Sequence, residues 1–252
     1  MLAEDRLQRI VGIVDARGSA TVSELMGALG ASESTVRRDL LRLAESGRVV
    51  KVHGGATAIA RNVVAADQTV AEKHSLHLDE KTRIARYAAD LIGPEDFVYI
   101  DAGSTTGRLV DFVTETRATY VTNSIANAHV LLSKGCHVIL PAGELKAVTE
   151  ALVGEQTIES IRRFRFTIGF FGANGATPDA GFTTPEVGEA CVKREALKRT
   201  MRPYVLCDSS KFSAVSPVSF AEFEDAVVVT ELVPEELAGK GSIVVAPDAV
   251  AR

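Results

Sequence analysis

Residues 32–40 read SESTVRRDL, and this stretch decides how the front of the chain folds. Its serines are favoured helix caps, and apolar residues then recur at Val36, Leu40 and Leu43 until Gly47 interrupts the pattern. Spacings of three and four place these apolar side chains on one side of a helix. The pattern therefore predicts a helix that begins at one of the two serines, buries one face and ends near the glycine.

A shorter helix is predicted just before it, in the sequence TVSELMGALG at residues 21–30. Ser23 is a suitable N-cap, Gly30 is a suitable C-terminal stop, and only the residues GAS link the two helices. An amphipathic segment around residues 7–14 predicts one more helix ahead of them. Two short helices joined by a tight turn that contains glycine indicate a helix-turn-helix over about residues 20–39.

The outward face of the second of these two helices carries hydroxyls and arginines. Ser34, Thr35 and Arg38 lie opposite the apolar stripe near the helix N-terminus, where a recognition helix reaches base edges. Arg37 lies at the flank of the stripe and suits a phosphate contact. A carboxylate in such an interface would repel phosphate, so we expect Asp39 to orient a neighbouring arginine instead.

The next residues, RVVKVHGGAT, alternate between apolar and polar side chains. This alternation and the glycine pair predict a strand and a turn, that is, a β wing beside the recognition helix. Lys51 or His53 would then lie along the phosphate backbone or the neighbouring minor groove. Leu41, which faces outward, is expected to pack under the wing. The predicted DNA-contacting residues are Ser34, Thr35, Arg37, Arg38, Arg42, Lys51 and His53.

The charge of the chain is distributed unevenly. The net charge is −5, yet residues 1–60 hold eight lysines and arginines and seven acids, so they carry +1 and the remainder carries −6. A helix surface rich in arginine is most often just a solvated face, so the arginines alone do not indicate DNA binding. Together with the capped helices, the short turn and the basic hairpin, they favour a DNA-binding domain over residues 1–57.

The stretch from Thr21 to Ala56 resembles the winged helix-turn-helix of the DeoR family of bacterial transcription regulators. The signature of that family runs through a Ser-x-x-Thr-Val-Arg-Arg-Asp-Leu helix and ends in His-Gly-Gly-Ala. This chain has both parts, at residues 32–40 and 53–56. The resemblance implies that double-stranded operator DNA is a partner.

Residues 58–80 have weak periodicity and several polar breaks, which indicates a linker. Within it, His74 and His77 have the spacing of a metal-binding pair, but no further ligand follows at a suitable spacing. We therefore predict a solvated linker and no metal site. The three cysteines lie far apart and suit neither a metal site nor a disulfide framework, which favours a reducing cytoplasm.

From residue 81 to residue 252 the chain alternates between helix-like segments and short apolar runs such as FVYID, TYVTN and AVVVT. Strands separated by single helices are typical of a mostly parallel sheet flanked by helices. The sequence therefore predicts an α/β domain here. No apolar run reaches the length that spans a membrane, so no membrane partner is expected.

Polar and small residues gather where the predicted strands end. DAGSTTGRL, residues 101–109, opens a helix whose free N–H groups attract an anion. The later ends TNS, PAGE, FGANG and CDSSKF offer side-chain donors, a cation and small residues that let a ligand approach the backbone. Each turn alone is most often ordinary helix capping, but such ends share one sheet edge and together predict an anion pocket. These ends supply Ser104, Thr105, Thr106, Asn123, Ser124, Gly143, Gly172, Asn174 and Lys211.

This half of the chain is also similar to the effector domain of the DeoR family, whose fold resembles ribose-5-phosphate isomerase and which binds phosphorylated sugars or their derivatives. The resemblance implies that Lys193, on the helix after GFTTPE, stands at the position of a family lysine. It also implies a pocket lined by Asp101, Gly103, Ser104, Thr105, Thr106, Asn123, Gly172 and Lys211. No Walker loop or dinucleotide fingerprint occurs, so no cofactor is predicted.

Ribose-5-phosphate isomerases carry acids in an Asp-Gly-Ala-Asp-Glu segment at the strand end that matches FGANG. At the acidic positions this chain has Phe171, Asn174 and Gly175. An isomerase needs a carboxylate base to move a proton between adjacent carbons. The pocket is therefore predicted to hold a sugar phosphate without converting it.

The sequence as a whole predicts a transcription regulator, a repressor of a carbohydrate-use operon that a phosphosugar releases from DNA, with fructose phosphates as first candidates. A homodimer or homotetramer is expected because a single winged helix reads few base pairs. Two alternatives stay open: a sugar-phosphate isomerase that carries a DNA-binding module, and a nucleic-acid-binding protein with no small ligand.

Overall fold

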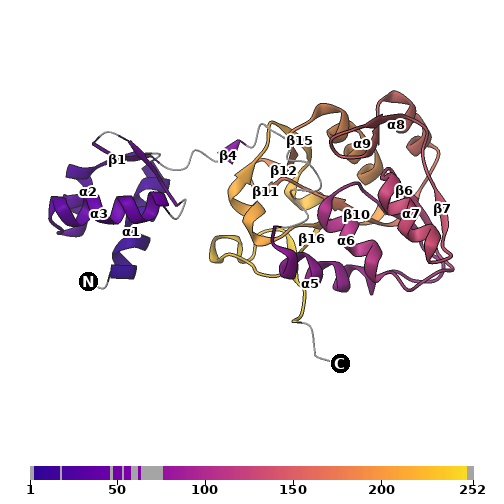
Figure 1. Ribbon diagram of the computed structural model, residues 1–252, viewed down its shortest axis with the longest axis horizontal. Helices are drawn as coiled ribbons and strands as arrows, with labels where there is room; N and C mark the ends of the chain where they lie inside the picture. Colours follow the sequence, from indigo (N-terminus) through magenta and orange to yellow (C-terminus); the bar gives the residue numbers. More distant parts are fainter. Residues whose placement is uncertain are drawn as a thin grey trace. The chain divides into compact units, whose positions relative to one another are not determined.

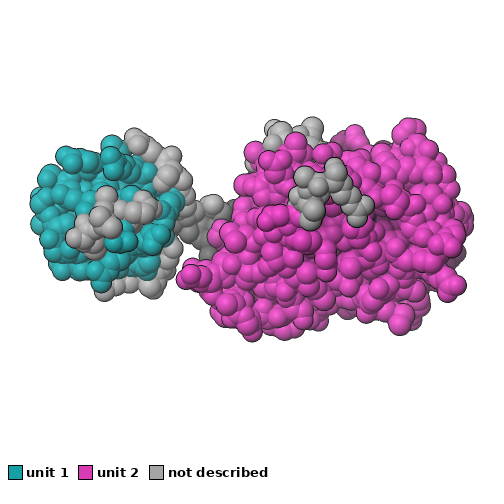
Figure 2. All heavy atoms as spheres, turned by 90° about the horizontal axis from the view of Figure 1, so that it is seen from below, with its two compact units in different colours: residues 1–62 teal, residues 63–252 magenta. Residues whose placement is uncertain are grey.

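The computed structural model describes residues 3–17, 19–45, 48–52, 54–57, 62–63 and 76–248. The chain divides into two compact units, residues 1–62 and residues 63–252, which Figure 2 shows in teal and magenta. His53 and His74, which the sequence analysis singles out, lie outside the described residues, as does most of the predicted linker. None of the described helices combines the length and the apolar character needed to cross a lipid bilayer.

Helices and a small antiparallel sheet form the first unit (Figure 1). The strand order in its sheet is β1-β3-β2. The predicted stripe of Val36, Leu40 and Leu43 is buried in the core of this unit, which confirms the expected facing of the third helix. The elements are α1 (Ala3–Arg17), β1 (Ser19–Thr21), α2 (Val22–Leu29), α3 (Glu33–Glu45), β2 (Val50–Val52) and β3 (Gly55–Thr57).

The helix ends of this unit follow from local chemistry. Thr21, and not Ser23 as expected, caps α2: its side chain accepts from the Glu24 N–H, and the Glu24 carboxylate accepts from the Thr21 N–H at 2.7 Å. This reciprocal pair satisfies two donors that the first turn leaves free. Gly30 ends α2 at a φ of 61°, a left-handed conformation that glycine adopts without strain.

The wing depends on a glycine at the point where two strands approach closely. A Cβ atom at Gly55 would lie 2.3 Å from the Ala20 carbonyl oxygen, so only glycine lets β3 pair with β1 at this distance. Gly54 provides the turn between β2 and β3 with a φ of 86°. With α2 and α3, this hairpin completes the predicted winged helix-turn-helix.

A seven-stranded sheet in the order β17-β16-β13-β10-β5-β6-β7 organises the second unit. All neighbouring strands in it pair in parallel, which confirms the predicted parallel sheet. The strands are β5 (Phe97–Ile100), β6 (Thr119–Thr122), β7 (His137–Ile139), β10 (Phe166–Gly172), β13 (Thr200–Leu206), β16 (Val227–Thr230) and β17 (Ser242–Val245).

Helices cover both faces of this sheet and bury two apolar clusters. Along β5 the side chains alternate, so Val98 and Ile100 join one cluster and Tyr99 joins the other. The first cluster includes side chains from α5, α6 and α7, and the second includes side chains from α8 and α9. The helices are α5 (Leu78–Ala89), α6 (Ser104–Phe112), α7 (Ile125–Ser133), α8 (Glu155–Arg162) and α9 (Val187–Lys198).

Short strands that the sequence did not predict lie outside the main sheet. Three of them form a sheet of order β11-β12-β15, and two more form the hairpin β8–β9. Segments of two to four residues are too short to show a periodic pattern, which is why they escape prediction. They are β4 (Asn62–Val63), β8 (Glu144–Lys146), β9 (Ala151–Val153), β11 (Gly175–Thr177), β12 (Gly181–Thr184), β14 (Ala214–Val215) and β15 (Val218–Ala221).

We expect Phe166→Ala to weaken the second unit strongly. Phe166 is fully buried and packs against the rings of Phe97 and Tyr99, with centroid distances of 5.7 and 5.1 Å. Its removal should lower the free energy of unfolding by about 3–5 kcal/mol because the cavity cannot close. Urea denaturation followed by circular dichroism measures the change. Met201→Ala, at a side chain that is 79% exposed, is the control, and equal midpoints for both variants would contradict the packing described.

Candidate functional site

One surface of α3 presents the predicted DNA-contacting side chains of that helix. Ser34, Arg37, Arg38 and Arg42 are exposed and Thr35 is partly exposed. Arg37 donates from Nε to Glu33 Oε1 at 2.8 Å, in an ion pair that is open to solvent. Within the described part of the chain, Arg38 and Arg42 form no hydrogen bond or ion pair. Two guanidinium groups on this surface are therefore available to an anion at no cost in broken contacts.

The only carboxylate in the middle of α3 is turned away from this surface. Asp39 is 2% exposed and accepts a hydrogen bond from Arg6 Nε of α1 at 2.5 Å. That bond raises the pKa of Arg6 above its ordinary value. The expected partner arginine is thus supplied by another helix, and the ion pair ties α1 to α3. The negative charge is neutralised inside the unit.

The hairpin beside α3 carries one described basic side chain of the predicted set. Lys51 on β2 is exposed, and the Arg48 N–H donates to the Leu43 carbonyl at 2.8 Å where the chain leaves α3. Whether His53 joins this surface falls outside the described residues. The expectation that Leu41 packs under the wing is wrong, since this residue is 45% exposed.

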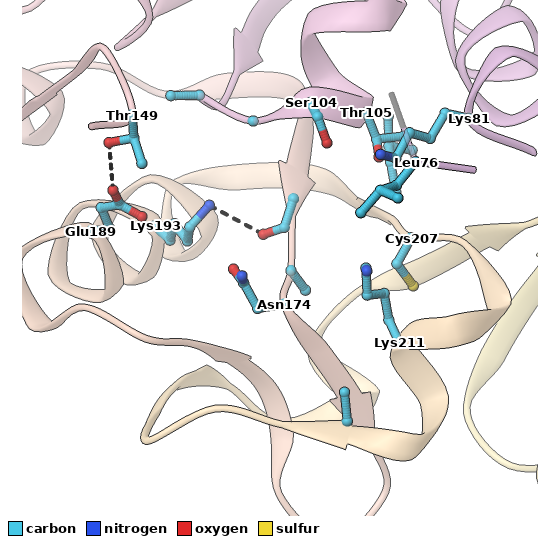
Figure 3. Close-up of a pocket in the computed structure, with 16 residues that line it drawn as sticks. Leu76, Lys81, Ser104, Thr105, Thr149, Asn174, Glu189, Lys193, Cys207 and Lys211 are labelled. Atoms are coloured by element: carbon cyan, nitrogen blue, oxygen red, sulfur yellow. Dashed lines mark hydrogen bonds between the residues drawn. The ribbon is translucent and has the colours of Figure 1, made fainter. Parts of the chain in front are cut away.

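A cavity of about 260 Å³ opens in the second unit at the carboxyl ends of β5, β10 and β13 (Figure 3). This is the edge of a parallel sheet where ligands bind. The predicted residues that line it are Gly103, Ser104, Thr105, Gly172, Asn174, Lys193 and Lys211. The chemically informative residues that line it without having been predicted are Leu76, Lys81, Thr149, Glu189 and Cys207.

A buried ion pair forms the floor of this cavity. Lys193 Nζ, on a residue that is 4% exposed, donates to Asp101 Oδ2 and to the Gly172 carbonyl at 3.1 Å. The Gly172 N–H donates to the same Asp101 oxygen at 3.1 Å. Burial raises the pKa of Asp101 above its ordinary value, against the lowering effect of Lys193. Asp101 does not line the cavity itself; it holds the lysine that does.

The N-terminus of α6 lies at the cavity wall. Gly103 precedes the helix and provides no side-chain cap, and Ser104 and Thr105 follow along the wall. Uncapped N–H groups and the helix dipole favour an anion at this place. Thr106 is fully buried and donates to the Gly103 carbonyl at 3.1 Å, so it supports the turn from behind.

Lysines border the same end of the cavity (Figure 3). The side chain of Lys211 is 30% exposed, and its Nζ lies 3.8 Å from Oδ2 of the buried Asp208. Lys81 of α5 is buried on the opposite side of this end. Cys207 lies between them, and burial raises the pKa of its thiol, which keeps the sulfur protonated and uncharged.

A carboxylate lines the other end of the cavity. Glu189 of α9 accepts hydrogen bonds on Oε1 from Lys146 Nζ at 2.9 Å and from Thr149 Oγ1 at 2.7 Å. Both donors come from the β8–β9 hairpin, which no sequence pattern predicted. Glu189 itself could have been found, because it stands four residues before Lys193 on one face of the same helix.

The remaining predicted residues lie behind the cavity wall. Asn123 is buried, accepts from the Ala102 N–H at 2.9 Å and donates to the Leu152 carbonyl at 3.3 Å, so it joins two strand ends. Ser124 caps α7 and lines a second cavity of about 170 Å³. Gly143 lines neither cavity, and a Cβ atom there would lie 1.9 Å from the Thr157 hydroxyl oxygen.

Metal-binding side chains do not gather in the described ranges: no group of three or more His, Cys, Asp or Glu residues there could hold an ion. His77 is described and lies 3.7 Å from Glu80 across one helix turn. His74, its predicted neighbour in the sequence, lies outside those ranges.

Breaking the floor of the cavity should be costly. In Asp101→Asn the ammonium of Lys193 loses its charged partner in a buried site, and the free energy of unfolding should fall by about 3–5 kcal/mol. The double variant Asp101→Asn/Lys193→Met removes both charges and should recover most of the loss. Guanidinium denaturation of both variants measures this. A single variant as stable as the unaltered protein would contradict the ion pair described.

Two family models match the chain, and together they account for both units. The model of the DeoR-like helix-turn-helix domain matches residues 6–62, and the model of the DeoR C terminal sensor domain matches residues 76–231. Among solved structures, ribose 5 phosphate isomerase A from Neisseria gonorrhoeae is 14% identical with a TM-score of 0.40, and covers 54% of each chain. A likeness this slight adds nothing to the fold described above.

Curated relatives match along nearly the whole chain. An uncharacterized HTH-type transcriptional regulator of Bacillus subtilis (strain 168), FruR, is 37% identical over 231 residues and covers 91% of this chain and 91% of its own. The lactose phosphotransferase system repressor of Staphylococcus epidermidis (strain ATCC 12228) is 34% identical over 224 residues and covers 88% of each. Since the sensor-domain model spans more than half of the sequence, and these relatives exceed 30% identity, the chain belongs to the DeoR family.

Proposed function

We propose that this protein represses a carbohydrate-use operon in the cytoplasm, reads its operator with α3 and the wing, and leaves the DNA when a phosphorylated sugar enters the cavity. The proposal rests on the presence of two surfaces in the same chain, each suited to an anion. Unpaired arginines lie on an exposed helix of the first unit, and an uncapped helix N-terminus with lysines beside it borders the cavity of the second. The names of the relatives, a transcriptional regulator and a sugar-system repressor, support it.

The charge arrangement of α3 supports contact with DNA. Arg38 projects near the N-terminal half of the helix, the part that reaches base edges in helix-turn-helix proteins. Arg37 leaves Glu33 at little cost, because exposed ion pairs contribute only about 0–1 kcal/mol. Asp39, the carboxylate that would repel phosphate, is already neutralised by Arg6. The surface that faces outward is therefore basic.

The cavity supports a small phosphorylated ligand. A phosphate at the N-terminus of α6 would accept hydrogen bonds from the backbone N–H groups around Ser104 and Thr105, and Lys211 would compensate its negative charge. Sugar hydroxyls would reach Asn174 and the polar groups at the far end. The volume of about 260 Å³ is close to the lower limit of small-molecule pockets, roughly 300 Å³, and so suits one monosaccharide better than a nucleotide.

Release from DNA would follow if the ligand bound one arrangement of the subunits more tightly than another. We propose a homodimer or homotetramer, since two half-sites multiply affinity through effective concentration. Light scattering on the purified protein tests the assembly. The alternative isomerase activity is tested by incubating the protein with hexose and pentose phosphates and looking for product by chromatography.

Arg38→Ala should weaken operator binding by about 1–3 kcal/mol and relax the preference for one base pair, because a base contact is lost. Fluorescence anisotropy with operator variants at fixed salt measures both effects. The exposed Arg163 of the second unit provides a control, Arg163→Ala, that removes the same charge outside the proposed surface. Equal losses in the two variants would show that only net charge matters.

Lys211→Ala should weaken binding of the phosphosugar by about 1–2 kcal/mol, because a charge-assisted contact to the phosphate at a partly exposed site is lost. Calorimetry with fructose 1-phosphate and fructose 6-phosphate measures the effect, and operator affinity without ligand should not change. Lys198→Ala is the matched control, since Lys198 is exposed on α9 and does not line the cavity. Undiminished binding in the Lys211 variant would place the phosphate elsewhere.

A further inference from the structure

The cavity has two chemically different ends. Figure 3 shows Lys81, Thr105 and Lys211 at one end, and Glu189 with Thr149 at the other, with Lys193 and Asn174 between them. The N-terminus of α6, which is the positive end of the helix dipole, lies beside the end that carries Lys81 and Lys211. Lys81 and Lys211 therefore line one end of the cavity, and a carboxylate that is paired with Lys146 lines the opposite end.

The carboxylate of Glu189 is held in a fixed orientation and has one free acceptor. Lys146 Nζ and Thr149 Oγ1 both donate to Oε1, which locks the group against the β8–β9 hairpin. Among the described residues nothing donates a hydrogen bond to Oε2, although the residue lines the cavity and its side chain is only 11% exposed. An ionised carboxylate is an acceptor only, so the free oxygen can accept a hydrogen bond from a ligand in the cavity.

Of the lysines that line the cavity, Lys193 lies nearest to this end, and its charge is already compensated. The ammonium group of Lys193 forms an ion pair with Asp101 and donates a second hydrogen bond to the Gly172 carbonyl. It can therefore offer the ligand a hydrogen bond but no unpaired charge.

The negative charge of Glu189 also acts on the ion pair of Lys193 with Asp101. Burial is the main cause of the raised pKa of Asp101, and repulsion from Glu189 adds a smaller contribution in the same direction. Glu189 forms an ion pair with Lys146, whose Nζ also lies 3.9 Å from Glu186 Oε2. Among the described residues this cluster thus holds two carboxylates and one lysine, so a second anionic group at this end would meet a net negative charge.

We propose that Glu189 determines the ligand class: the effector carries one phosphate, and its other end presents neutral hydroxyls. Glu189 Oε2 accepts a hydrogen bond from one of those hydroxyls, and its charge excludes sugar bisphosphates and phosphorylated sugar acids. Such repulsive elements give discrimination that attractive contacts alone do not provide. The assignment rests on the proposed function and specifies which phosphosugars the same cavity accepts.

The experiment compares four probes by calorimetry: fructose 1-phosphate, fructose 6-phosphate, fructose 1,6-bisphosphate and 6-phosphogluconate. The full chain should bind at least one fructose monophosphate about tenfold or more tightly than the bisphosphate and the sugar acid. In Glu189→Gln the amide oxygen still accepts from Lys146 and Thr149 while the negative charge is gone. This variant should bind the monophosphate more weakly and bring the affinity ratio to within about threefold.

Glu195→Gln is the matched control on the same helix. Glu195 accepts from Arg199 Nε at 2.5 Å, its side chain is 19% exposed, and it does not line the cavity. Glutamine keeps an acceptor for Arg199 and removes the same charge, so the ratio of affinities should stay as in the unaltered protein. Operator binding without ligand, measured for all three proteins, reports whether each variant is folded.

The outcomes separate the two levels of the argument. If none of the probes binds although the operator does, the proposed phosphosugar sensing fails, and the assignment of Glu189 fails with it. If a monophosphate binds but the bisphosphate binds equally well or better in the unaltered protein, the role of Glu189 alone is overturned. A ratio that Glu189→Gln and Glu195→Gln change to the same extent overturns it as well, because general charge then explains the selectivity.

Discussion

The buried ion pair between Lys193 and Asp101 is the contact on which the second unit's cavity depends. It joins α9 to the carboxyl end of β5, and through the Gly172 carbonyl and N–H it reaches β10 as well. Three elements far apart in the sequence are thereby held at one point of the sheet edge. A buried pair of this kind contributes little net stability, but neither charge tolerates the loss of the other. The ion pair therefore holds α9, β5 and β10 together at the cavity floor, and the other lining groups are arranged around it.

The same physical rule operates in both units: carboxylates are neutralised inside, and cations remain where an anion can reach them. Asp39 is paired with Arg6 in the core of the first unit, which leaves the arginines of α3 facing solvent. Asp101 is paired with Lys193 in the second, while Lys211 stays partly exposed at the rim. A chain with a net charge of −5 can thus present two local surfaces suited to anions.

The sequence predicted whatever repeats with a period or sits at a strand end. The stripe at Val36, Leu40 and Leu43, the parallel sheet and the glycine and hydroxyls after β5 all have such patterns. It did not predict Lys81, Thr149 or Glu189 at the cavity, because their positions depend on how α5, the hairpin and α9 pack. Nor could periodicity separate Asn123, which supports a strand end from behind, from residues that line the cavity. Only the packed structure distinguishes the side chains that line the cavity from those that lie behind them.

The β8–β9 hairpin borders the cavity from outside the main sheet. It supplies Lys146 and Thr149 to one end of the cavity. It stands outside the ladder of the seven parallel strands, and an isolated bridge between Ser124 and Ala151 joins it to the end of β6. A substitution of Thr149 in its turn changes a side chain that lines the cavity and touches none of the seven parallel strands. The groups that border this end of the cavity are thus encoded apart from the strands that build the sheet.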